Sequence, residues 1–145
     1  WLDVKSCPYQ ECIRVPLWIR APGLSARHDT SLAANIDLAP TIAAWAGISA
    51  PAIIDGVSLV PLLIDPATPW RGAILVEHLG TPTLAHIDSQ GVRTSRYLYN
   101  EYVNGDRELY DHLLDPFELT NVVNDPAYAG TLATLQATLA TLKAS

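Results

Sequence analysis

The chain has 145 residues, of which 49% are hydrophobic and 17% are charged, a composition typical of a folded globular protein rather than a disordered one. Its formal net charge is −6 and its nine Lys and Arg residues are scattered. This argues against nucleic-acid binding, because a polyanionic partner needs concentrated positive charge. No apolar run reaches the roughly 18 residues of a membrane-spanning helix.

The sequence starts at Trp1, contains no Met and shows no signal-peptide pattern. We therefore interpret it as a piece of a longer protein and assign no compartment. Two cysteines, Cys7 and Cys12, are too few for a disulfide framework or a four-thiolate zinc site. We expect partly buried free thiols. A local disulfide is the alternative, which only geometry can decide.

The first half of the chain predicts one strand and one helix. The apolar run Ile13–Arg20 is typical of a strand buried on both faces, with residues 21–23 as the turn that ends it. Residues 35–46 predict a helix with Asp37 as N-cap and Gly47 as its end. Its expected buried stripe consists of Leu38, Ile42 and Trp45.

The second half changes character after an irregular connection, residues 51–69, with one helical turn around residues 59–63. Short β-rich segments separated by polar turns, at residues 89–91 and 104–106 among others, predict an antiparallel meander. The expected strands are Ala73–His78, Leu84–Asp88, Val92–Thr94, Tyr97–Val103 and Glu108–Tyr110.

The C-terminal tail predicts an amphipathic helix. Asp125 is its cap, Pro126 opens it, and four leucines recur at spacings of 3, 4 and 3. The stripe consists of Leu132, Leu135, Leu139 and Leu142. Because such a stripe must be buried, we expect it on the adjacent sheet. The tyrosines of residues 97–102 are then expected to pack sheet against helix, and an aromatic sugar platform is the alternative.

Three segments together resemble the sulfatase family of the alkaline phosphatase superfamily. Residues 5–17 resemble K-x-x-P-Y-E-E-S-I-R-V-P-L and lead into R-x-P-G at residues 20–23. Residues 35–48 resemble N-x-D-x-x-P-T-x-x-x-x-A-G-I, and residues 55–63 resemble D-G-x-S-L-x-P-L-L. Residues 108–121 resemble E-L-Y-D-L-x-x-D-P-x-E-x-x-N. The matches occur in the family's order and span nearly the whole chain.

The resemblance implies a fold class and a division of the chain. Residues 1–69 are expected to form the C-terminal part of the α/β core, at the edge of an alkaline-phosphatase-like sheet. Residues 70–145 are expected to form an α+β subdomain, a small antiparallel sheet packed by the C-terminal helix. The resemblance also implies a formylglycine nucleophile from C/S-x-P-x-R and a divalent metal, Ca²⁺. Neither that motif nor the family's metal-binding Asp residues occur in this chain.

Lys5 matches a catalytic position of the family, where the resemblance implies that its ammonium reaches the sulfate and stabilises negative charge. Read without the motif, it is an exposed lysine. Arg14 is expected to pair structurally with a carboxylate, with a substrate contact as the alternative. Glu11 is one candidate partner, and a surface carboxylate at a strand end is the other interpretation of Glu11. His78 and His86 flank a loop and are our hypothesis for substrate contacts, with loop anchoring as the alternative.

We assign no metal ligand to this chain. The four histidines have no metal-ligand spacing, and Asp111, Asp115 and Glu118 do not follow the calcium-loop spacing. Turn and cap roles suit these three acids better.

The leading hypothesis is the C-terminal portion of a sulfuric ester hydrolase that acts on a sulfated small molecule or sugar and is inactive alone. The alternatives are a phosphate or phosphonate ester hydrolase of the same superfamily and a non-enzymatic binding module. The sulfatase hypothesis predicts an exposed apolar face around residues 13–19, through which a homo-oligomer could form.

Overall fold

The computed structural model describes residues 7–49, 53–79 and 88–144. It divides into two compact units: a helical unit, Leu17–Gly72, and a sheet unit formed by Trp1–Pro16 with Ala73–Ser145. The mixture of helices with an antiparallel sheet confirms the expected mixed α/β class. Within the described ranges, no helix combines the length and apolar character that a membrane span requires.

The sheet unit is built on a four-stranded antiparallel meander in the order β1-β2-β3-β4, as predicted. Gly105, with φ of 91°, makes the predicted turn between β3 and β4. Of the expected strand Leu84–Asp88, only Asp88 is described, and it is not in a strand. The strands are β1 (Ala73–His78), β2 (Ser89–Thr94), β3 (Tyr97–Tyr102) and β4 (Arg107–Asp111).

The predicted turn at residues 89–91 is wrong, because these residues form the first half of β2. Ser89 pairs with His78 on one side and with Tyr102 on the other. The polar residues and the glycine at positions 89–91 favour a turn locally. A strand that lies between two neighbouring strands, however, has its backbone N–H and C=O groups satisfied on both edges.

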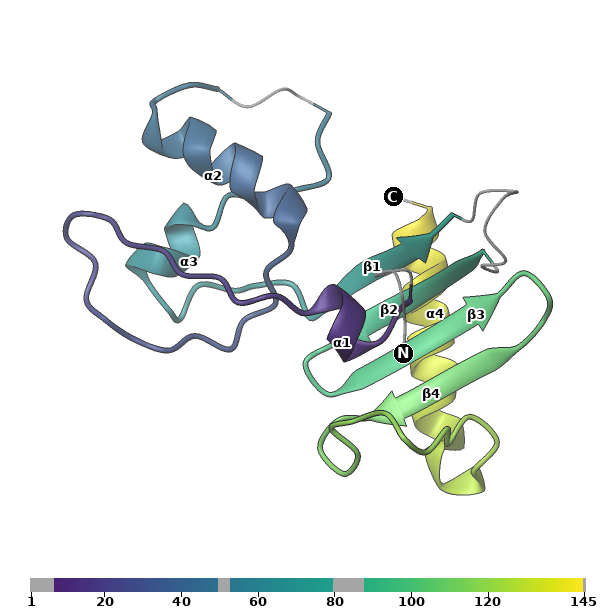
Figure 1. Cartoon of the computed structure of the whole chain (residues 1–145). Helices are drawn as coiled ribbons and strands as arrows, with labels where there is room; N and C mark the ends of the chain where they lie inside the picture. The colour runs from purple at the N-terminus through teal and green to yellow at the C-terminus, as the bar shows by residue number, and fades with distance from the viewer. Residues whose placement is uncertain (1–6, 50–52, 80–87, 145) are drawn as a thin grey trace. The chain divides into compact units, whose positions relative to one another are not determined.

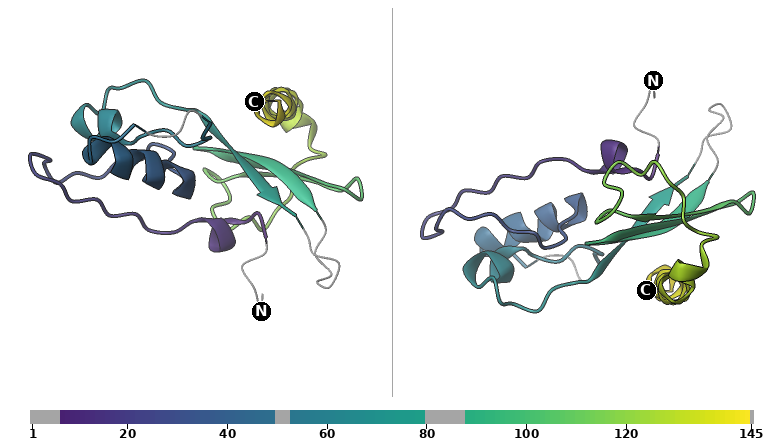
Figure 2. Two further views of the ribbon diagram at one scale, coloured as in Figure 1. Left: turned by 90° about the horizontal axis from the view of Figure 1, so that it is seen from above. Right: turned by 90° about the horizontal axis from the view of Figure 1, so that it is seen from below.

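Helix α4 (Ala129–Lys143) covers one face of the sheet, as Figures 1 and 2 show. Leu135 and Leu139 are buried on it, and Leu132 and Leu142 pack beside them, so the predicted stripe is confirmed. The strands contribute Val92, Tyr99 and Leu109 to this core. Burying each large apolar side chain contributes about 1.5–3 kcal/mol.

The start of the tail helix is also as predicted. Asp125 accepts a hydrogen bond from the Ala127 N–H at 2.9 Å and thereby caps a short 3₁₀ turn, η2 (Pro126–Tyr128), that leads into α4. Tyr99 is fully buried against α4, and its hydroxyl accepts a hydrogen bond from Gln136 at 3.2 Å. Packing, the favoured role for this tyrosine, is therefore confirmed.

The helical unit contains a 3₁₀ turn and two short helices. They are η1 (Asn35–Asp37), α2 (Leu38–Trp45) and α3 (Val60–Ile64). The predicted helix and the predicted turn near residues 59–63 both form, and Gly47 ends α2 with φ of 68°.

Asp37 does not cap α2 with its side chain, which corrects the predicted role. Its fully buried carboxylate accepts the backbone N–H groups of Ala34 and Val57 at 2.8 and 2.9 Å and pairs with Arg71. A buried carboxylate is stable only when its oxygens are satisfied by such donors. The Asp37 side chain therefore links the segment that follows α2 to the 3₁₀ turn that precedes α2.

Two expectations of apolar burial are wrong for this chain. Residues 14–20 follow the short helix α1 (Gln10–Ile13) and belong to no strand. No described segment offers them the backbone partners that a strand needs. Trp18 is 92% exposed, and the expected stripe on α2 is also exposed. An exposed apolar face around residues 13–19 is what the sulfatase hypothesis predicts.

Gly91 offers a direct test of the sheet packing. A Cβ at this position would lie 2.6 Å from Asn100 Oδ1 and 2.6 Å from the Tyr99 carbonyl oxygen. We expect Gly91→Ala to lower the free energy of unfolding by about 1–3 kcal/mol through overpacking. Urea denaturation of the chain measures the change.

Gly130→Ala is the matched control, because Gly130 lies in α4 with open space at its Cβ. It should raise stability by about 0.5–1 kcal/mol. Equal urea midpoints for the two variants would contradict the packing at Gly91.

Candidate functional site

The sheet has a second face, opposite α4, that carries polar groups. The core side chains point toward α4, so their neighbours along the strands lie on the other side. Strand register places Gly91, Asn100 and Glu108 next to one another in a row across this face. Helix α1 lies on this side of the sheet in both views of Figure 2.

Tyr9 ties the segment around α1 to this face. Its hydroxyl lies 3.0 and 3.1 Å from the two carboxylate oxygens of Glu108, and the Tyr102 hydroxyl donates to Glu108 at 2.8 Å. The Tyr9 ring also meets the Tyr110 ring edge-on at 6.0 Å. Burial, together with the neighbouring carboxylate, raises the pKa of Tyr9 and Tyr102, so both remain hydrogen-bond donors at neutral pH.

Glu118 supplies a second tie to the same segment. Its Oε2 accepts the Gln10 backbone N–H at 2.9 Å, and its Oε1 lies 2.6 Å from His112 Nε2. The side chains of Glu118 and His112 are only 2% and 7% exposed. Among the described residues Glu118 is the sole non-glycine residue with positive φ, at 55°. Such a backbone conformation costs energy, and it occurs at the residue that bonds the Gln10 N–H.

Cys7 and Cys12 are joined by a disulfide, with their Cα atoms 5.8 Å apart. The expectation of two free thiols is therefore wrong, and the alternative is correct. Since Cys12 lies in α1, the bond brings Cys7 back beside the helix. Tyr9 and Gln10, the two tethered residues, both lie within the closed ring.

Asn100 is the most unusual polar group on this face. It is fully buried, and neither its amide nitrogen nor its amide oxygen has a hydrogen-bond partner. The side chain lies over Gly91, where only a glycine leaves room for it. A buried amide without partners is destabilising by roughly 1–3 kcal/mol.

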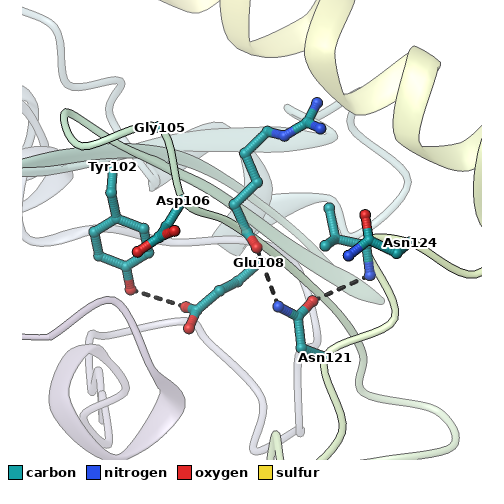
Figure 3. A pocket seen from close by; sticks show the side chains of 8 residues that line it. Tyr102, Gly105, Asp106, Glu108, Asn121 and Asn124 are labelled. Atoms are coloured by element: carbon teal, nitrogen blue, oxygen red, sulfur yellow. Dashed lines mark hydrogen bonds between the residues drawn. The ribbon is translucent and has the colours of Figure 1, made fainter.

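A polar hollow of about 540 Å³ lies at the β3–β4 hairpin (Figure 3). Tyr102 and Glu108, which are hydrogen-bonded to each other, form part of its wall. The Asn121 side chain donates to the Arg107 carbonyl and accepts from the Leu109 N–H, both at 3.0 Å. These groups satisfy each other, so we assign the hollow no ligand. Its lining consists of Tyr102, Gly105, Asp106, Arg107, Glu108, Asn121, Val123 and Asn124.

The predicted site residues are only partly within the described chain. Lys5 and His86 lie outside the described residues. His78 ends β1, opposite Ser89, and the strand alternation places it on the same side of the sheet as α1. In the part of the chain that the structure describes, no ion pair joins Arg14 to Glu11, and Glu11 is exposed, which agrees with the second interpretation of this carboxylate.

Asp111, the last residue of β4, and Asp115, in the loop after it, have structural roles, as predicted, whereas the Glu118 side chain makes the long-range tie to Gln10 in place of the expected turn role. Asp111 forms two hydrogen bonds with Arg96, which holds the pKa of the Asp111 carboxyl below its ordinary value. Asp115 accepts the Thr120 N–H at 2.7 Å in the turn. Within residues 7–49, 53–79 and 88–144, no three metal-ligating side chains gather closely enough to hold an ion.

The ties made by Glu108 and Glu118 are the feature that the sequence did not reveal. Tyr9 and Glu108 are 99 positions apart, and Gln10 and Glu118 are 108 apart. All four residues lie within segments that resemble the family's motifs, and this coincidence was the one available indication that the segments meet.

Comparisons with known proteins identify the family. The model of the family "N-sulphoglucosamine sulphohydrolase, C-terminal" matches residues 1–145. The chain belongs to this sulfatase family. An N-acetylglucosamine-6-O-sulfatase of Bacteroides thetaiotaomicron is 34% identical over 137 residues, which cover 89% of this chain and 24% of that protein. The expected sulfatase C-terminal portion is thus confirmed.

Two solved structures resemble this sulfatase chain. One is a complex with the substrate D-glucosamine-2-N,6-O-disulfate, with a TM-score of 0.72 and 29% identity, covering 78% of this chain and 24% of the other. The second is the phosphonate monoester hydrolase of Agrobacterium radiobacter, with a TM-score of 0.64 and 28% identity, covering 74% and 24%. The chain therefore spans about a quarter of the length of the relatives that it matches.

The Glu118 tie makes a prediction about the segment it holds. Glu118→Ala should remove the acceptor of the Gln10 N–H, and a charge-assisted hydrogen bond contributes about 1.5–3 kcal/mol. We expect Gln10 amide hydrogen exchange to accelerate by roughly 10- to 100-fold. NMR-detected exchange on the chain measures this.

Glu11→Ala is the control, because Glu11 lies in the same helix but is exposed. It should leave the exchange at Gln10 close to that of the unaltered chain. Similar acceleration in both variants would show that general fraying of α1, and not the loss of the Glu118 tie, controls the amide.

Proposed function

We propose that this chain is the C-terminal portion of a sulfuric ester hydrolase that uses a formylglycine nucleophile and a divalent metal, Ca²⁺, both supplied by an upstream part of the enzyme. One observation carries the proposal: the family match extends over all 145 residues, including the Lys5 position of the motif. The tethered segment that begins at Cys7 follows Lys5 after a single residue.

Lys5 has the chemistry that sulfate ester cleavage needs. Negative charge grows on the sulfate oxygens and on the leaving oxygen as the ester bond breaks, and a fixed cation with N–H donors stabilises it. An ammonium group offers three donors on a flexible stem. In this proposal Lys5 binds the sulfate and stabilises that charge, while the ties to Glu108 and Glu118 hold the segment that follows it.

The residues that the structure describes do not fit the metal. Across the described ranges no three metal-ligating side chains lie together. We therefore place the ligands of the metal, like the nucleophile, in the part of the enzyme that this chain does not contain.

For the substrate we propose a sulfated sugar. This rests on the relative named as an N-acetylglucosamine-6-O-sulfatase and on the structural neighbour bound to a disulfated glucosamine. His78 and His86 remain our proposed contacts to the sugar, and His78 lies on the same side of the sheet as the tethered segment. A homo-oligomer through the exposed apolar face around residues 13–19 also remains a prediction.

A second candidate, hydrolysis of a phosphonate or phosphate ester, is favoured by the likeness to the phosphonate monoester hydrolase. Sulfate and phosphonate esters are both tetrahedral anions, so a lysine could serve either. Parallel turnover assays with aryl sulfate, aryl phosphonate and sulfated glucosamine on the longer enzyme would rank them.

Replacement of Lys5 tests the proposed role. In the longer sulfatase that carries this chain, Lys5→Ala should lower kcat by about 10²–10³-fold, the usual effect of losing one stabilising donor. Lys143→Ala removes the other lysine of the chain, at the end of α4, and should leave turnover within about twofold. Equal activities of the two variants would refute the role of Lys5.

The 145-residue chain alone should show no metal-dependent sulfatase turnover, because nucleophile and metal ligands are proposed to lie elsewhere. An aryl sulfate assay with added Ca²⁺, run beside the longer enzyme, checks this. Turnover by the isolated chain that a chelator abolishes would show that it holds a complete catalytic site of its own.

A further inference from the structure

The Cys7–Cys12 disulfide closes a six-residue ring that contains both tethered residues. Tyr9 is bound to Glu108, and the Gln10 N–H is bound to Glu118. Pro8, also in the ring, is buried. The ring is thus fixed to the sheet unit by side-chain ties on two different elements, β4 and the loop after it.

The disulfide extends this fixation to Cys7. Among the residues that the structure describes, Cys7 is bonded only to Cys12, which lies in α1. Without that bond, Cys7 would be joined to the tethered Tyr9 only through Pro8. With it, Cys7 is held from both sides, by the peptide chain and by the disulfide.

Lys5 is two residues before Cys7, so its Cα lies within about 7 Å of the Cys7 Cα whatever the conformation between them. We propose that the disulfide ring is a positioning element for the Lys5 ammonium, and that its reduction lowers turnover by releasing Cys7. This inference rests on the proposed sulfatase function. A small misplacement of a group that acts on the transition state can cost about 10²-fold in rate.

The ring is open to chemical reduction. Both cysteines are only partly buried, so a soluble reductant can reach the sulfur atoms. A water-soluble phosphine attacks one sulfur and breaks the S–S bond; water then supplies oxygen to phosphorus and protons to the sulfurs. The products are two thiols and a phosphine oxide. Glu108 and Glu118 keep their ties to Tyr9 and Gln10, so we expect the sheet unit to stay folded.

The experiment uses the longer sulfatase that carries this chain, with the double variant Cys7→Ser/Cys12→Ser. We expect kcat to fall by about 10- to 100-fold with KM changed less than about threefold, because a positioning loss affects the transition state more than substrate binding. Phosphine treatment of the unaltered enzyme should give the same fall. The double variant is the matched control and should not respond to phosphine.

Combining the cysteine replacements with Lys5→Ala distinguishes a positioning role of the ring from general destabilisation of the enzyme. Lys5→Ala should cost about 10²–10³-fold in the unaltered enzyme and less than about tenfold when both cysteines are already replaced, since the lysine is then misplaced. If Lys5→Ala costs the same in both backgrounds, the ring does not act through Lys5 and the inference is overturned.

The inference and the proposed function fail in different ways. If Lys5→Ala leaves turnover unchanged in the unaltered enzyme, the proposed role of Lys5 fails, and the inference fails with it. If Lys5→Ala is costly but neither serine replacement nor phosphine lowers kcat, the function stands and the positioning ring is refuted. A phosphine effect of equal size in the double variant would also refute it.

Discussion

Two part-buried carboxylates, Glu108 and Glu118, hold the N-terminal segment of the sheet unit in place across about 100 residues of sequence. Each accepts hydrogen bonds from that segment and from a neighbour, Tyr102 or His112. Carboxylates at such depth are tolerated only when donors surround them. The meander and α4 therefore form a platform, and the segment that follows Lys5 is mounted on the side that α4 leaves uncovered.

This arrangement gives a physical meaning to most of the motif residues that resemble the family. Asp37 and Asp111 each satisfy backbone donors and pair with one arginine. Asn121 bonds the backbone of β4 much as another strand would. The polar groups of these residues are therefore occupied by contacts within the chain. Lys5 lies outside the described residues, and the role proposed for it is the catalytic one that the motif implies.

The sequence predicted the elements better than it predicted their connections. The strand Ala73–His78 and the leucine stripe of the tail helix followed from local patterns, because alternation and helical spacing express burial directly. The role of Asp37 could not be foreseen in the same way, since its partners Val57 and Arg71 are 20 and 34 positions away. Capping rules consider only residues within the adjacent turn of the helix, so they do not include partners this distant in sequence.

The same limit explains the errors at residues 89–91 and at Glu118. Considered locally, a Ser-Gln-Gly sequence favours a turn. In the structure the Asn100 side chain lies over Gly91, so this position within the strand requires a glycine. Glu118 was given a turn role, and its bond to Gln10 depends on a contact 108 positions away. Hydrophobic periodicity does not reveal such long-range polar contacts, yet they hold the segment around Tyr9 and Gln10 on the sheet. The chain resembles both a protein bound to its disulfated glucosamine substrate and a phosphonate monoester hydrolase. Under the proposed function, the nucleophile and the metal site would choose between sulfur and phosphorus, and Lys5 would supply a cation suited to either tetrahedral anion.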